Sequence, residues 1–289
     1  MSGVTATRPG PGPARRDPPW LVGTLVAVCL AWCGLLLVLP LVTVFAEALR
    51  KGVGLFAEAA RDPEALSAMR LTLLVCLVAV PLNTVFGIAA AWAVTKFEFP
   101  GRSLLVALID LPFSISPVVS GLMLVLLYGT HGWLGPVLEA LGIQVIFAFT
   151  GLVLATTLVT LPFVARQLIP IMQAQGLDEE QAAATLGAGP WRTFFLVTLP
   201  NIRWALMHGV LLCTARAMGE FGAVSVVSGH IRGQTATMPL QVEILYNEYN
   251  SVAAFSLAAI LAMFALVTLA VKHLLELRHG AELAALKQR

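Results

Sequence analysis

"GLDEEQAAATLGAGPWRTFFLVTLP", residues 176–200, is the longest polar interruption in the second half of an otherwise apolar chain. Hydrophobic residues make up 58% of the 289 residues, charged residues 12%, and the mean hydropathy is +0.86. A soluble domain has roughly 25% charged residues, so this composition predicts an integral membrane protein. The net charge of +2 is too small to indicate a nucleic-acid-binding protein.

Apolar runs on both sides of this stretch are long enough to cross a bilayer, which takes about 20 residues. Four of the runs are uncharged, and two are interrupted. The run at 103–128 contains Asp110 and two prolines, and the run at 204–228 contains Arg216 and Glu220. We predict an all-α protein with one transmembrane domain, residues 20–276, and six spans. The predicted spans are about 20–46, 71–95, 103–128, 145–169, 204–228 and 249–273.

The N-terminal segment is rich in proline and carries Arg15 and Arg16 ahead of the first apolar run. We expect residues 1–19 to form a disordered tail. A signal peptide has an apolar core of about 7–15 residues, and the first run is longer, so it is predicted to be a retained helix. Most Lys and Arg residues near span ends fall on the side of the N terminus. Both termini, including the tail at 277–289, are therefore predicted to be cytoplasmic.

On this topology the opening stretch is cytoplasmic, and its first part has the pattern of a short helix. Asp178 is spaced to cap the helix, with Gln181 reaching back, as in a capping box. Ala182, Ala183 and Leu186 are predicted to form a face of mainly small side chains. Such a face fits the groove of a partner protein.

The second part of the stretch predicts another helix. Gly187 and Gly189 break the first helix, and Pro190 suits the first position of the second. The second helix is predicted to end before Pro200. Its bulkier apolar surface consists of Trp191, Phe194, Phe195 and Val197. Two interpretations stay open on physical grounds: an amphipathic connector on the membrane surface, or a docking element for a partner.

The stretch resembles the EAA signature of bacterial ABC-importer permeases, in which E-A-A is followed after three residues by G and after nine more by I-x-L-P. The matching residues are Gln181, Ala182, Ala183, Gly187, Val197, Leu199 and Pro200. Gln181 stands where the signature has Glu. The resemblance implies an ABC-importer permease fold of the methionine-importer-like type. It also implies that the loop is a coupling helix seated in a groove of a cytoplasmic ATPase.

The chain has no G-x-x-x-x-G-K-[ST] phosphate-binding loop. We therefore expect ATP and Mg²⁺ to bind the partner ATPase, and no cofactor to bind this chain. Its four cysteines lie in apolar spans and are interpreted as small buried residues. The scattered histidines suggest neither a metal site nor a catalytic one.

The fifth predicted span carries two opposite charges one helical turn apart, Arg216 and Glu220. A charge at the centre of a bilayer costs on the order of 2.5 to 3.5 kcal/mol, so both groups should face a partner or a pathway. Either they form an ion pair that locks helices together, or they take part in transport. Gly219 and Gly222 are predicted to let another backbone approach closely.

The third predicted span is broken within "DLPFSISPVVSG", residues 110–121. Its prolines free backbone groups that nearby hydroxyls can satisfy, and broken helices in transporters often border the solute route. Asp110, Ser114, Ser116 and Ser120 are therefore candidates for the translocation path. A proline kink packed against a neighbouring helix is the alternative.

Both interrupted spans resemble the oxyanion branch of these permeases, which carries a motif close to A-R-A-x-G-E-F-G. The longer run "ARAMGEFGAVSVVSGHIRGQTATMPLQVEILYNEYN", residues 215–250, is similar to the W-type permease subunits of bacterial sulfate/thiosulfate importers. The resemblance implies a sulfate/thiosulfate permease in the bacterial cytoplasmic membrane. The implied partners are a T-type permease, two copies of an ABC ATPase and a periplasmic or extracellular sulfate/thiosulfate-binding protein.

Two other functions remain alternatives. A molybdate or tungstate permease shares the motif around Arg216 and Glu220. An integral-membrane enzyme could use Asp110, Arg216 and Glu220 as acid, base and anchor, but it would leave the loop at 176–200 unexplained.

Overall fold

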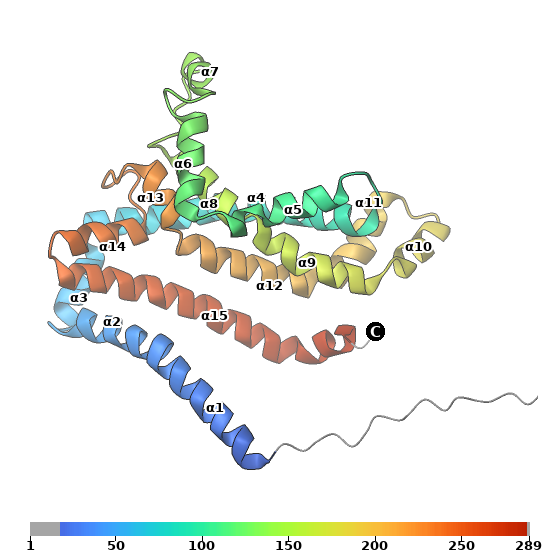
Figure 1. Ribbon diagram of the computed structural model, residues 1–289, viewed down its shortest axis with the longest axis horizontal. Helices are drawn as coiled ribbons and strands as arrows, with labels where there is room; N and C mark the ends of the chain where they lie inside the picture. The colour runs from blue at the N-terminus through green and yellow to red at the C-terminus, as the bar shows by residue number, and fades with distance from the viewer. Residues whose placement is uncertain (1–17, 288–289) are drawn as a thin grey trace, which may run out of the picture.

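The computed structural model describes residues 18–287, and every regular element in this range is a helix. Five helices are long and apolar enough to cross a membrane, and there are six spans if one bent pair counts as a span. The predicted all-α membrane class is confirmed (Figure 1). Of the two predicted tails, residues 1–17 and 288–289 lie outside the described range. The long helices are Trp20–Leu49, Pro63–Lys96, Phe149–Gln175, Pro190–Met218 and Ser251–Leu274.

The first long helix consists of α1 (Pro19–Cys33), a first π turn (Gly34–Val38) and α2 (Leu39–Leu49). The π turn accommodates Pro40, which cannot donate a backbone hydrogen bond and whose ring would clash in a regular helix. The amide of Leu39 bonds the carbonyl of Gly34, five residues back. No residue in the apolar window of this helix is buried by the rest of the described chain. Accordingly, α1 diverges from the other helices in Figure 1, whereas α2 lies beside α15.

The central core is formed by α4 (Pro63–Lys96), α8 (Phe149–Thr160), α9 (Pro162–Gln175) and α12 (Leu199–Met218). Leu168 and Ile202 are fully buried there. A Cβ atom built on Gly87 would lie 2.7 Å from Cβ of Val164, so α4 and α9 approach closely only because Gly87 lacks a side chain. Small residues allow this kind of packing in membranes, where the apolar solvent supplies no hydrophobic drive.

The third predicted span is two helices, α5 (Arg102–Ser114) and α6 (Pro117–Tyr128), whose axes differ by 109°. The break lies at Ile115 and Ser116, which have extended backbone, as expected for a residue that precedes a proline. α6 packs against α13 (Gly222–Ser228). It turns away from the long helices together with the short α7 (Gly135–Ala140), as Figure 1 shows.

The second helix predicted for the stretch at 176–200 does not end before Pro200. Instead, α11 (Pro190–Thr193), a second π turn (Phe194–Thr198) and α12 form one helix from Pro190 to Met218. The amide of Leu199 bonds the carbonyl of Phe194, five residues back, and this wider turn accommodates Pro200. Compared with the predicted span at 204–228, this helix starts earlier and stops at Met218, while Gly222–Ser228 forms the separate α13.

The two ends of the bundle differ in the elements that they carry (Figure 1). One end, called the loop end below, carries α10 (Asp178–Thr185) and α11. The opposite end carries α3 (Val53–Arg61) and α14 (Met238–Asn247). From there α15 (Ser251–Lys287) runs back toward the loop end.

Candidate functional site: the 176–200 loop and the intramembrane charges

The first helix of the loop, α10, starts one residue earlier than a cap by Asp178 would require. Leu177 is the N-cap residue, Asp178 is the first helical residue, and no side chain caps the helix. The predicted capping box of Asp178 and Gln181 is therefore wrong. Three carboxylates, Asp178, Glu179 and Glu180, instead occupy the first turn, where the helix dipole favours negative charge.

Two of these carboxylates hold α10 against the bundle. Nζ of Lys96, at the end of α4, lies 3.1 Å from Oε2 of Glu180 and donates to the carbonyl oxygen of Gly176 at 2.6 Å. Thr198 donates its hydroxyl to Oε1 of Glu180 at 2.7 Å. Asn201 of α12 donates its side-chain amide to Glu179. Lys96 and Gly176 are 80 residues apart, and no local sequence pattern indicates that they meet.

The residues of the EAA-like signature lie mostly on the outer side of the loop. Gln181 and Ala182 are exposed, Ala183 is half-buried, and Leu186 is 88% exposed. Gly187 has a φ of +82°, which favours glycine, and a Cβ built on it would meet nothing within 4 Å in the described chain. The first helix therefore presents to solvent a partly apolar surface of mainly small side chains.

Of the aromatic residues in the second part of the loop, one is buried in the bundle and two are exposed. Phe194 is 8% exposed, and its ring centroid lies 4.9 Å from that of Trp92 on α4. Trp191 and Phe195 are exposed and stack on each other with centroids 6.3 Å apart. Of the remaining signature residues, Val197 and Leu199 are half-buried and Pro200 is exposed. Phe194 anchors the loop to α4, and sequence reasoning did not identify Trp92 as its partner.

The intramembrane charges Arg216 and Glu220 form the ion pair that their spacing allows, with Nη1 of Arg216 2.7 Å from Oε2 of Glu220. The Glu220 side chain is 1% exposed and that of Arg216 34% exposed. Oε1 of Glu220 accepts the backbone N–H of Ala223 at 3.1 Å. Glu220 thereby links the end of α12 to the start of α13.

None of the other predicted path residues, all of which the structure describes, forms a side-chain hydrogen bond or ion pair with Arg216 or Glu220. Asp110 accepts a 2.7 Å hydrogen bond from Nε of Arg166 on α9. Ser114 and Ser116 are exposed at the break between α5 and α6, and Ser120 is buried on α6. Asp110 is therefore part of a separate ion pair, while the three serines lie at the break and on α6. The kink and the helix-locking pair, which were the alternatives to a transport role, both occur in the structure.

A buried polar cluster in the core was not predicted, because Asn83 lies in an otherwise apolar run. Asn83 is fully buried and donates from Nδ2 to the carbonyl oxygen of Thr157 at 3.1 Å and to Oγ1 of Thr160 at 2.7 Å. These bonds join α4 to α8, because a buried amide must find partners inside the bundle.

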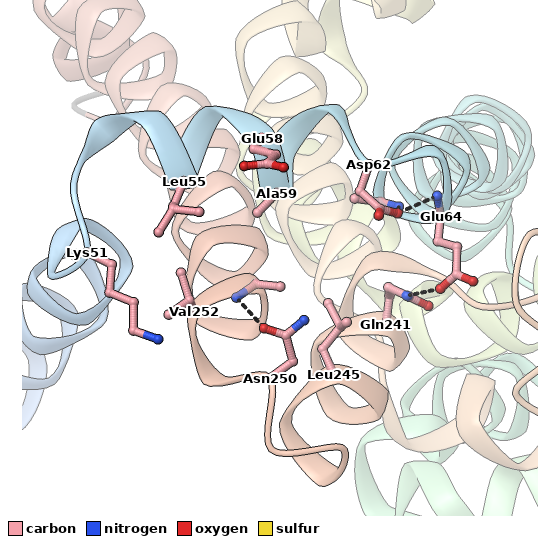
Figure 2. A pocket seen from close by; sticks show the side chains of 12 residues that line it. Lys51, Leu55, Glu58, Ala59, Asp62, Glu64, Gln241, Leu245, Asn250 and Val252 are labelled. Atoms are coloured by element: carbon pink, nitrogen blue, oxygen red, sulfur yellow. Dashed lines mark hydrogen bonds between the residues drawn. The ribbon is translucent and has the colours of Figure 1, made fainter.

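A pocket of about 320 Å³ lies at the opposite end of the bundle, between α3, α14 and the start of α15 (Figure 2). Several of its polar groups already bond within the chain. Asp62 accepts the amide of Glu64 at 2.8 Å, and Gln241 donates to Oε2 of Glu64 at 3.1 Å. Asn250 accepts the amide of Ala253 at 3.4 Å.

Metal-binding and redox features are sparse in the described residues. No three His, Cys, Asp or Glu side chains within residues 18–287 are grouped to hold a metal ion. Cys76 and Cys213 are buried as predicted, whereas Cys29 and Cys33 are exposed. The prediction for the latter two is wrong within this chain, because they lie on α1, which diverges from the bundle.

Comparison with known proteins connects these features to a family. Residues 83–278 match the family described as "Binding-protein-dependent transport system inner membrane component". The sulfate transport system permease protein CysW of Synechocystis sp. is 54% identical over 256 residues, which cover 89% of this chain and 93% of that protein. The sulfate transport system permease protein CysT of Escherichia coli is 35% identical over 257 residues, covering 89% and 91%.

Among solved structures, the fold is similar to a chain of a bacterial alginate ABC transporter in complex with an alginate pentasaccharide-bound periplasmic protein. The TM-score is 0.74 at 16% identity, covering 90% of this chain and 94% of that one, and this likeness concerns the fold alone. The family match covers more than half of the chain, and the identity to the permeases extends over nearly all of it. The chain therefore belongs to the family of binding-protein-dependent transport system inner membrane components.

Proposed function

We propose that this chain is the W-type permease subunit of an ATP-driven ABC importer that moves sulfate and thiosulfate into the cytoplasm. It is a transport subunit, and ATP hydrolysis belongs to a partner. The observation that carries the proposal is α10, whose inner carboxylates hold it to α4 and α12 while its small outer face is exposed. A helix presented in this way is suited to a groove of another protein. The sulfate permeases among the relatives support the choice of solute.

The proposed assembly is a heterodimer of this chain with a T-type permease, two copies of an ABC ATPase that bind ATP and Mg²⁺, and an extracytoplasmic binding protein. CysW and CysT relatives both align along nearly the whole chain, which supports a pair of similar permeases. The unburied apolar window of the first helix leaves room for contacts with a second membrane subunit. We place the multi-pass chain in the bacterial cytoplasmic membrane with the loop end and both termini in the cytosol.

The alternative functions have less support. A molybdate or tungstate permease would use the same fold and the same pair of charges, and only resemblance outside that pair favours sulfate. An intramembrane enzyme would need Asp110 near Arg216 and Glu220, but Asp110 is paired with Arg166 instead.

Uptake of radiolabelled sulfate by cells with and without the gene, in a strain that lacks other sulfate importers, tests the solute. We expect uptake to be lost without the gene, and we expect unlabelled thiosulfate, but not molybdate, to compete with sulfate in the gene-containing cells. Unchanged sulfate uptake in the deletion strain would contradict the sulfate assignment. The chain would then be assigned as an ABC permease for another oxyanion.

The docking role of α10 is tested separately by Leu186→Asp. A charge placed on this exposed apolar residue should be buried without a partner when the ATPase binds, so the ATPase should no longer copurify with the permease. Tyr249→Asp is the matched control, because Tyr249 is 93% exposed just before α15, at the opposite end of the bundle. Copurification of the ATPase with Leu186→Asp at the wild-type level would reject docking through this face.

A further inference from the structure

The contact between Lys96 and Glu180 is an ion pair withdrawn from solvent at the loop end. The Lys96 side chain is 6% exposed and that of Glu180 is 17% exposed, whereas the side chains of Arg166 and Asp110 are 54% and 35% exposed. A charge pair removed from water is held in one geometry, and removing either partner leaves an uncompensated charge. The pair between α4 and α10 is thus a specific and directional contact.

The Glu180 carboxylate uses its two oxygens for two different helices. Oε2 faces Lys96 at the end of α4, and Oε1 accepts the hydroxyl proton of Thr198 in the second π turn. Lys96 in turn donates to the carbonyl oxygen of Gly176, two residues before α10. One carboxylate therefore joins α10 both to α4 and to the second π turn, which continues into α12.

The covalent connections of α10 do not fix its orientation by themselves. Gly176 precedes the helix with a φ of +70°, and Gly187 follows it with a φ of +82°. Glycine has more backbone freedom than any other residue, so α10 can change its orientation at both connections. Side-chain contacts on the inner face must therefore hold α10 in place relative to α4 and α12.

We propose that Glu180, through Lys96 and Thr198, is the positioning residue that transmits displacement of α10 to α4 and α12. Glu180 directly precedes Gln181, the residue that replaces the glutamate of the EAA-like signature. It acts on the side of the helix opposite the proposed docking surface. The inference rests on the proposed function, in which α10 seats on an ATPase and is moved by it.

The test uses the whole transporter, reconstituted in proteoliposomes with its ATPase and binding protein, and measures sulfate taken up per ATP hydrolysed. In Glu180→Gln, the isosteric amide removes the charge. We expect the ATPase to stay bound and to hydrolyse ATP, while the ratio falls by roughly tenfold, within the range typical of coupling between sites. Asp178→Asn is the matched control, because it removes an exposed charge from the same helical turn, and its ratio should equal that of the wild type.

Two further variants separate positioning from a role in folding. Lys96→Arg keeps a cation at the end of α4 and should preserve the ratio. Thr198→Val removes one partner of the carboxylate but leaves the ion pair intact, so it should lower the ratio, though by less than Glu180→Gln. If Glu180→Gln fails to assemble, a wild-type ratio in Thr198→Val would by itself contradict the positioning role.

The outcomes distinguish this proposal from the one on which it rests. A wild-type ratio in Glu180→Gln and Thr198→Val, with Leu186→Asp still releasing the ATPase, would overturn the positioning role alone. The variants could also assemble less well but keep the wild-type ratio in the complexes that do assemble. That result would show that the pair only stabilises the loop, and it would overturn the positioning role as well. Retention of the ATPase by Leu186→Asp would instead count against docking itself.

Discussion

Glu220 is a carboxylate that the described chain surrounds almost completely. It is held by the Arg216 guanidinium and by the amide of Ala223, and it sits where α12 ends and α13 begins. Arg216 lies in the last turn of α12, where the helix dipole favours a cation. Each charge is therefore compensated in part by the other, and the effects of removing them should not be additive.

At this scale we predict that Arg216→Ala destabilises the assembled complex more than the double variant Arg216→Ala/Glu220→Ala. Arg216→Ala leaves a buried carboxylate without its counter-charge, at a cost of about 3 kcal/mol, while the double variant removes both charges. The measurement is the temperature at which half of the complex no longer elutes intact after heating. If the double variant is equally or less stable than Arg216→Ala, pairing is not the main role of Arg216.

The close contact between α6 and α13 depends on two glycines that leave no room for a side chain. A Cβ on Gly121 would lie 2.7 Å from the carbonyl oxygen of Ala223, and one on Gly222 would lie 2.9 Å from Cβ of Pro117. The obstructing atoms belong to backbone and to a proline ring, which cannot move aside easily. A Cβ on Gly219 would meet only one atom within 4 Å, at 3.9 Å, so the predicted close approach holds at Gly222 and fails at Gly219.

We therefore expect Gly121→Ala and Gly222→Ala each to destabilise the complex by roughly 1–3 kcal/mol through overpacking. Gly219→Ala is the control in the same region and should be close to neutral. The same heating and elution assay measures all three. Equal effects at the three positions would mean that helix propensity, rather than the contact between α6 and α13, sets the outcome.

The sequence predicted elements better than it predicted their junctions. The apolar runs and the signature at Gln181–Pro200 indicated the helices and the loop, because both depend on local pattern. Pro200 was expected to end a helix, but a π turn carries the helix past it, and hydropathy contains no signal for that turn. Lys96 and Glu180 could not be paired in advance, because only the packed bundle brings their helices together.

For the whole molecule, the arrangement separates two surfaces at opposite ends of the bundle. The loop end carries α10 and its exposed residues, and the other end carries α3, α14 and the turn before α15 (Figure 1). In a membrane these two ends would face different compartments, since the long helices between them are apolar. The proposed topology then assigns Leu186 to the cytosol and Tyr249 to the outside.

Labelling of single cysteines tests this assignment. In a variant whose four native cysteines are replaced by alanine, Tyr249→Cys should react with a membrane-impermeant maleimide in intact spheroplasts. In cells without the ATPase, which is proposed to cover this position, Leu186→Cys should react only after the membrane is permeabilised. Both side chains are more than four-fifths exposed in this chain, so access rather than burial should decide the result. The reverse pattern would invert the topology.

The unbroken helix from Pro190 to Met218 also has a mechanical consequence. Its 29 residues extend roughly 44 Å at 1.5 Å per residue, from the loop end to the residue next to the Glu220 junction. Such a rod acts as a lever arm, and a tilt of about 10° about one end sweeps the other through roughly 8 Å. A small rotation imposed at α11 would thus become a displacement larger than an oxyanion at the far end, without any change in the helix itself.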